Sequence, residues 1–341
     1  FTASNLLTPY LLHRMIGSEE VYRATMSYLD WRVYGFFFSF IAVMFRAFYV
    51  STTNTKILTA NSVVMVLTNV VLNYILIFGK FGFPALGIAG AAIASSISEA
   101  VSVLFFVIYT WKKIDYKKYG LFRFTRVDFR MLGQILSVSI WVMIQHGIAF
   151  GGWFIFFIAM EHLGERPLAI TNVVRSISSF LFMFVNAFAS TNSSLVSNLI
   201  GAGESDRVLP LCRRMIGLCY AFVLPIGILI AMFPSTVLRI YTDNPDLIAS
   251  SIPSLWVMLS SYLFAVPGFI YFFSVSGTGN TRRALEIDMA SIFVYVLYIL
   301  YVAVWLRADV AVCWTTEYVY NIMILSSFFY LWKGNWRNKK I

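Results

Sequence analysis

The chain has 341 residues, of which 59% are hydrophobic and only 12% are charged. A typical soluble domain carries about 25% charged residues, so this chain has too little polar surface to be solvated on all sides. The composition therefore excludes an ordinary water-soluble enzyme or nucleic-acid-binding domain and predicts a protein surrounded by lipid. The net charge of +10 is expected to lie mainly in loops that face the cytoplasm.

Nine apolar stretches are long enough to cross a membrane as α-helices, which takes about 20 mostly apolar residues each. In chain order they span residues 25–50, 57–79, 86–112, 130–160, 168–198, 209–233, 250–275, 284–306 and 309–332. Residues 1–12 look like the end of one more helix. The runs are too long and continuous for the alternating strands of a membrane β-barrel. The sequence therefore predicts an all-α, polytopic membrane helix bundle.

Lysine and arginine are unevenly distributed among the connections between these stretches. Counted on alternate sides, 17 of them fall on one side and seven on the other, and the longest and most basic connection spans residues 113–129. The positive-inside rule predicts that this segment and the C-terminus lie in the cytoplasm. The basic segment also reads as a linker, which divides the chain into residues 1–112, the linker 113–129 and residues 130–341.

Three segments rich in small and polar residues follow one another along the chain. They are Asn69–Gly79 with the glycine-rich turn and helix start after it, Phe188–Gly203, and Ser276–Arg282. In this order they resemble signature segments of the multidrug and toxic compound extrusion (MATE) transporters. The resemblance implies a two-lobe fold of twelve helices, of which this chain lacks the first two to three. Residues 1–112 would then be a partial N-lobe and residues 130–341 the C-lobe.

The resemblance also implies a function. It predicts a secondary antiporter of the bacterial inner membrane that exports organic cations, drugs or toxic metabolites in exchange for H⁺ or Na⁺ by rocking of the two lobes. Such a carrier is expected to be a monomer, to contact a small-molecule substrate and lipid but no nucleic acid, and to need no cofactor besides its coupling ion. Two alternatives stay open. One is a lipid-linked oligosaccharide flippase of related fold, for which only Arg46 and Arg175 would be available to bind pyrophosphate, and the other is a truncated chain that does not transport.

Polar side chains in the middle of the apolar stretches are candidates for a substrate or ion cavity, because such groups are costly in lipid. The candidates are Asn69, Asn73, Glu99, Gln145, His146, Arg175, Asn186, Ser190, Tyr262 and Glu317. His146 could titrate near neutral pH, and residues 186, 190, 193 and 197 share one helical face. For each candidate a structural role, such as an interhelical hydrogen bond or a snorkelling arginine, is the competing interpretation.

The acids give two further expectations. Glu286 and Asp288 lie close to the cytoplasmic end of their helix and are expected to face solvent. Residues 262–267 contain no acid, so the sodium site that some MATE members build in this helix is not expected. No catalytic group or metal site is expected, because the three cysteines match no metal-ligand spacing and no enzyme motif is present.

Overall fold

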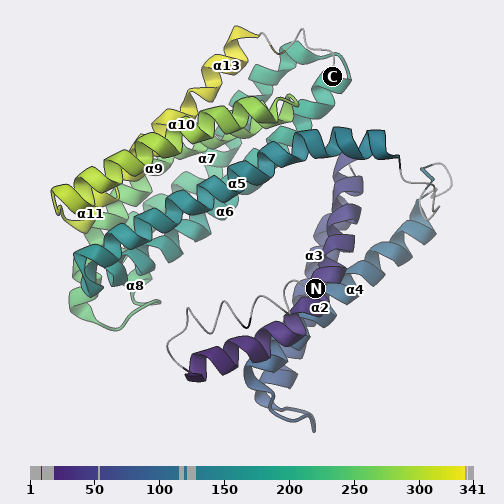
Figure 1. The fold of residues 1–341 in the computed structure, drawn as a ribbon, viewed down its shortest axis with the longest axis horizontal. Coiled ribbons are helices and arrows are strands. Elements are labelled where there is room, and N and C mark those ends of the chain that lie inside the picture. Colours follow the sequence, from purple (N-terminus) through teal and green to yellow (C-terminus); the bar gives the residue numbers. More distant parts are fainter. Residues whose placement is uncertain are drawn as a thin grey trace. The chain divides into compact units, whose positions relative to one another are not determined.

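The fold is that of a computed structural model, which describes residues 9, 19–52, 54–114, 119–120, 128–334 and 336. Within these residues nearly all of the chain is helical and none of it forms a strand (Figure 1). Eight helical stretches are long and apolar enough to cross a membrane, and they coincide with the first eight predicted stretches. The predicted all-α, polytopic bundle is thereby confirmed.

The helices follow one another along the chain. They are α2 (Glu19–Ser51), α3 (Lys56–Phe78), α4 (Gly87–Lys113), α5 (Phe129–Leu163), α6 (Glu165–Gly201), α7 (Val208–Met232), α8 (Pro234–Leu238), α9 (Pro245–Gly277), α10 (Thr281–Ile299), α11 (Val310–Cys313), α12 (Thr316–Leu325) and α13 (Ser327–Lys333). A 3₁₀ turn, η1 (Ser205–Arg207), precedes α7, and a π-helical segment, η2 (Leu300–Trp305), continues α10.

The ninth predicted helix is wrong as a single element. Residues 309–332 fold as the three short helices α11, α12 and α13. At the first break the amides of Thr315 and Glu317 bond to the carbonyls of Val312 and Trp314, three residues back, which tightens the turn. At the second break Ser326 separates α12 from α13. Average hydropathy does not reveal these breaks, because the few polar residues at them are outweighed by the apolar residues of the whole stretch.

The chain divides into two compact units, residues 1–126 and residues 127–341. Unit 1 contains α2, α3 and α4, with α4 packed against both of the others. The contact between α3 and α4 is close because Gly90 carries no side chain, and a Cβ there would lie 2.6 Å from the Leu76 carbonyl oxygen. The assignment of residues 1–112 and 130–341 to two lobes with a linker between them stays a prediction.

Unit 2 is built around α9, which is its most buried membrane-spanning helix. It packs on α6, α7 and α12, and Figure 1 shows the long helices α6, α7 and α9 running alongside one another. Pro267 lies inside α9 and cannot donate a hydrogen bond to the Leu263 carbonyl. The Tyr220 hydroxyl of α7 donates to that carbonyl instead, at 2.5 Å. The helix therefore passes through the proline without an unsatisfied backbone group at this point.

Candidate functional site

A buried acid lies at the contact of α5, α10 and α12. Asp288 is 2% exposed and accepts a hydrogen bond of 2.9 Å from the Tyr320 hydroxyl. Gln145 of α5 is also buried and interacts with the same carboxyl. The expectation that Asp288 faces solvent is therefore wrong, because α5 and α12 cover it. Glu286, half a turn away, is exposed as expected and pairs with Arg283.

A second acid, Glu317, lies on α12 and interacts with tyrosines of two other helices. Its neighbours are Tyr295 of α10 and Tyr262 of α9. Tyr295 is buried, and its hydroxyl has no hydrogen bond of ordinary geometry within the described residues. The rings of Tyr295 and Tyr320 meet edge to face, with centroids 5.9 Å apart. Each acid thus contacts a tyrosine from the other's helix, and we call Gln145, Asp288, Tyr295, Glu317 and Tyr320 the carboxyl seam.

The carboxyl seam has no basic counterpart. Among the residues that the structure describes, no Arg, Lys or His forms an ion pair with Asp288 or Glu317. Nor do three metal-ligating side chains come together anywhere in the described ranges. Two acids without a basic partner at membrane depth are costly when both are ionised. The seam is therefore suited to hold a proton or another small cation.

A polar stripe runs along the exposed side of α6. It consists of Asn172, Arg175, Ser179, Asn186 and Ser190, all exposed on unit 2. The Arg175 guanidinium lies 4.7 Å from the centroid of the Phe157 ring on α5, and no ion pair with an acid is seen in the described part of the chain. The stripe is unlike the rest of the exposed surface, which is dominated by large apolar side chains.

Two serines that the sequence places on the same face as the stripe have a different role. The Ser197 hydroxyl donates to the Gly277 carbonyl of α9 at 2.7 Å. A Cβ on Gly277 would lie 2.5 Å from the Ser193 carbonyl oxygen, so the two helices meet closely at this glycine. Ser193 and Ser197 thus belong to the contact between α6 and α9. For these two serines the structure favours a structural role over the lining of a cavity.

The remaining candidates of unit 2, Gln145, His146 and Tyr262, differ in burial and in their neighbours. Gln145 is buried in the carboxyl seam, whereas its neighbour His146 is exposed on α5. Tyr262 is 5% exposed, and its hydroxyl donates to the Ser178 carbonyl of α6 at 2.7 Å. Tyr262 therefore connects α9 to α6 from within the core.

In unit 1, Asn69 and Asn73 make a helix contact. The Asn69 amide donates to the hydroxyls of Ser95 and Ser98 on α4, at 3.3 and 3.5 Å. The Asn73 amide donates to the Asn69 side-chain oxygen at 2.9 Å. The bonds of Asn69 hold α3 against α4, and Asn73, on the same helix as Asn69, supports that side chain, so the structure supports a helix contact rather than a cavity wall within this unit.

Glu99 of α4 forms a two-pronged ion pair with Arg32 of α2. The two nitrogen–oxygen distances are 2.7 and 2.9 Å, and the side chains keep 16% and 20% of their exposure. Sequence analysis misses Arg32, since it considers only Arg46 and Arg175 as membrane-embedded arginines. The available signal is that Arg32 and Glu99 are both isolated charges in apolar stretches, where charges are expected to pair.

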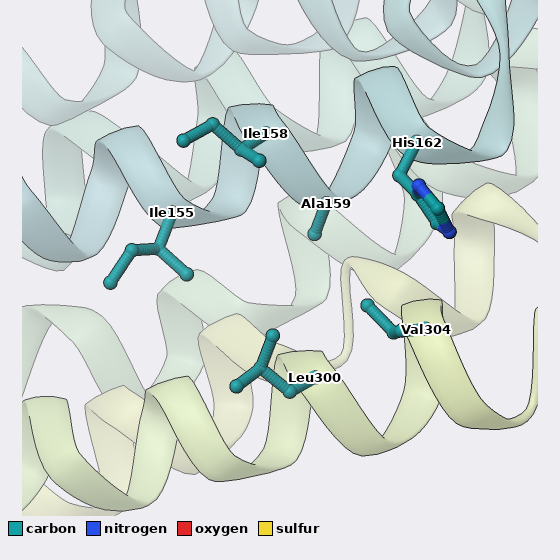
Figure 2. Close-up of a pocket in the computed structure, with 6 residues that line it drawn as sticks. All are labelled: Ile155, Ile158, Ala159, His162, Leu300 and Val304. Atoms are coloured by element: carbon teal, nitrogen blue, oxygen red, sulfur yellow. The ribbon is translucent and has the colours of Figure 1, made fainter.

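A hollow of about 230 Å³ lies between α5 and η2. It is lined by Ile155, Ile158, Ala159, His162, Leu300 and Val304. Figure 2 shows the His162 ring at one end of an otherwise apolar wall. None of the candidate residues lines it, so this hollow is separate from both the carboxyl seam and the polar stripe.

Comparison with known proteins gives the family. The model of the MatE family matches residues 2–75 and 142–302, which is more than half of the chain. The chain belongs to the MatE family. Relatives of this MatE chain include a probable multidrug resistance protein NorM of Thermotoga maritima, 29% identical over 239 residues, covering 69% of the chain and 50% of the relative. The probable multidrug resistance protein YoeA of Bacillus subtilis is 26% identical over 262 residues, covering 76% and 56%.

Solved structures agree on the fold. An outward-facing multidrug resistance MATE family transporter of the MOP superfamily superposes with a TM-score of 0.86 at 16% identity, covering 96% of this chain and 73% of that one. A MOP superfamily transporter from Pyrococcus furiosus gives 0.84 at 16% identity, with 96% and 73% covered. The resemblance seen in the sequence is confirmed, and this MatE chain is a multi-pass membrane protein. It spans about half the length of the NorM and YoeA relatives named above.

Proposed function

We propose that this MatE chain acts in a secondary antiporter that exports organic cations, drugs or toxic metabolites in exchange for H⁺ or Na⁺. Membership of the MatE family and the names of its relatives support export of drugs. The carrier would lie in the bacterial inner membrane as a monomer with its C-terminus in the cytoplasm, where the basic connections place it. It would alternate between the two sides by rocking of two lobes.

The polar stripe on α6 is the observation that carries this proposal. Amide, hydroxyl and guanidinium groups on the outer side of a membrane helix are too costly to face lipid chains, so they face water or protein. A few polar groups set among aromatic side chains are also typical of small-molecule sites. Here the aromatic neighbours include Phe157 and the exposed Phe180.

The two ends of the stripe differ in charge. Arg175 lies 11 residues before Asn186, which corresponds to about 16 Å along the helix. A cationic substrate is repelled by the guanidinium at short range, so it would bind at the end formed by Asn186 and Ser190. The coupling ion would bind separately, at the carboxyl seam.

The flippase alternative has less support. It needs cationic groups for a pyrophosphate. Of the arginines that could supply them, Arg32 is already paired with Glu99 and Arg175 lies against Phe157, which leaves Arg46, exposed on α2 of unit 1.

Accumulation of the fluorescent cation ethidium in cells that lack their own efflux pumps tests the proposal. Cells expressing the full-length protein are expected to retain less dye, and either a protonophore or removal of sodium should abolish the difference. Asn186→Leu should weaken export about tenfold, the effect of about 1.4 kcal/mol of lost binding. Asn198→Leu, the same change on α6 beyond the stripe, is the matched control. If correctly inserted protein expels no dye under either gradient, the proposal fails and lipid-linked oligosaccharide transport becomes the next assay.

A further inference from the structure

The helices α10 and α12 run antiparallel, and each carries one acid of the carboxyl seam. The Tyr298 hydroxyl of α10 bonds to Thr315 just before α12 begins, whereas Asp288, earlier on α10, bonds to Tyr320 further along α12. Glu317 lies close to Thr315 and therefore at the level of Tyr295 and Tyr298. Because Asp288 is bonded to Tyr320, and Glu317 precedes Tyr320 by three residues, the two acids lie about one turn apart along α12.

The ligand set of the seam favours a proton over a metal ion. Neither acid lies in a group of three metal-ligating side chains within the described residues. A cation such as Ca²⁺ takes about six to eight oxygen ligands, whereas a carboxylate binds a proton without any further ligand.

We propose that the carboxyl seam carries protons through unit 2, with Asp288 and Glu317 as two proton-binding groups that Tyr320 and Tyr295 connect. This rests on the proposed antiporter function and makes H⁺ its coupling ion. A proton from the Glu317 carboxyl enters on the oxygen of Tyr295 while the phenolic proton of Tyr295 leaves towards Tyr320. Tyr320 then gives its own proton to the Asp288 carboxylate. Each hydroxyl ends with the one proton with which it began, and no electrons are transferred.

The hydrogen bonds of the seam are suited to this role. Tyr320 already donates to the Asp288 oxygen, which is the direction that the last transfer needs. The Tyr295 hydroxyl is buried among these groups, with Glu317 and Tyr320 as its neighbours. Its interaction with Glu317 falls outside ordinary hydrogen-bond geometry. Tyr295 therefore lies between the two acids, where the proposed transfer needs it.

The groups that face the seam from the surrounding helices are neutral or weakly acidic. Gln145 comes from α5 and Tyr262 from α9, and the other members lie on α10 and α12 themselves. Since no described Arg, Lys or His pairs with either acid, a proton is the available means of neutralising it.

Infrared difference spectroscopy of the full-length protein between acidic and alkaline pH measures protonated carboxyl groups directly. Glu317→Gln and Asp288→Asn are each expected to remove one titrating carboxylic-acid band. Glu286→Gln, which changes an exposed acid on the same helix α10, should leave both bands. Sodium at constant pH should change neither band. The proposal is overturned if the two substitutions remove no titrating band, or if sodium displaces the protons.

Proton-driven ethidium transport into proteoliposomes tests the connection between the two acids. Tyr295→Phe should leave both infrared bands in place and slow transport about a hundredfold, the low end of what a positioned proton-transfer group contributes. Tyr298→Phe removes a hydroxyl one turn further along α10 and should transport like the wild type. Equal rates for the two variants would overturn the path through Tyr295.

The same experiments separate the two proposals. If the wild type moves dye with a sodium gradient and not with a proton gradient, the seam proposal falls while the antiporter stands. If the wild type moves no dye at all, the antiporter fails, and the infrared bands then decide whether Asp288 and Glu317 bind protons.

Discussion

Replacing Glu99 with glutamine should destabilise unit 1 by leaving the Arg32 guanidinium without its partner. The ion pair has distances of 2.7 and 2.9 Å, and only 20% and 16% of the side-chain surfaces stay exposed. Breaking a fully buried pair costs about 3–5 kcal/mol, and losing an exposed pair costs about 0–1 kcal/mol. With about four fifths of both side chains covered, we expect Glu99→Gln to lower the free energy of unfolding by about 3 kcal/mol.

Removing both charges should cost less than removing one. The double variant Arg32→Gln, Glu99→Gln leaves no unpaired charge, so we expect it to recover at least about 1 kcal/mol relative to Glu99→Gln. Unfolding by sodium dodecyl sulfate in mixed micelles, followed by circular dichroism, measures both changes. Glu19→Gln breaks the exposed pair with Arg23 on the same helix α2 and should cost less than about 0.5 kcal/mol. If the single and double variants unfold alike, the pair contributes no coupling energy and the reasoning is refuted.

Two further predictions concern unit 2. Gly277→Ala should lower stability by about 1–3 kcal/mol in the same unfolding assay, because its Cβ would lie 2.5 Å from the Ser193 carbonyl. Gly217→Ala, whose Cβ would meet nothing within 4 Å, should show no such loss. Asn186→Cys should react with a water-soluble maleimide if the stripe lines a water-filled cavity, whereas Val185→Cys, fully buried at the adjacent position, should not. Equal labelling of the two would count against the cavity.

Much of the fold can be predicted from the sequence, because apolar length is the property that a membrane requires of a helix. Eight long apolar stretches are eight long helices in the structure. The breaks around Trp314 and Ser326 are different, because they depend on local backbone hydrogen bonding, which the average hydropathy of a stretch does not report. A prediction of span length therefore succeeds where a prediction of helix continuity fails.

The candidate site is only partly predictable for a related reason. The sequence shows that Glu317 and Glu99 are acids in apolar stretches, but their partners, Tyr295 and Arg32, come from other helices. Asp288 lies close to the start of α10, and a residue near the end of a membrane helix is expected to be exposed to solvent. Its burial depends on α5 and α12, which cover it from outside its own helix. Depth along a helix can be read from one sequence, whereas rotation towards a neighbouring helix cannot.

Tyr262 joins the carboxyl seam to the helix that carries the polar stripe. Its hydroxyl proton is used by the Ser178 carbonyl of α6, while Glu317 of α12 is its charged neighbour. The Tyr262 oxygen also lies 3.1 Å from the Ser178 hydroxyl, so its interaction with Glu317 is electrostatic. In the proton-driven antiporter proposed above, loss of a proton from Glu317 would therefore change the charge next to the hydroxyl that holds α9 against α6. The proton and the substrate would then need no direct contact, because the contact between α9 and α6 would respond to the charge of the seam.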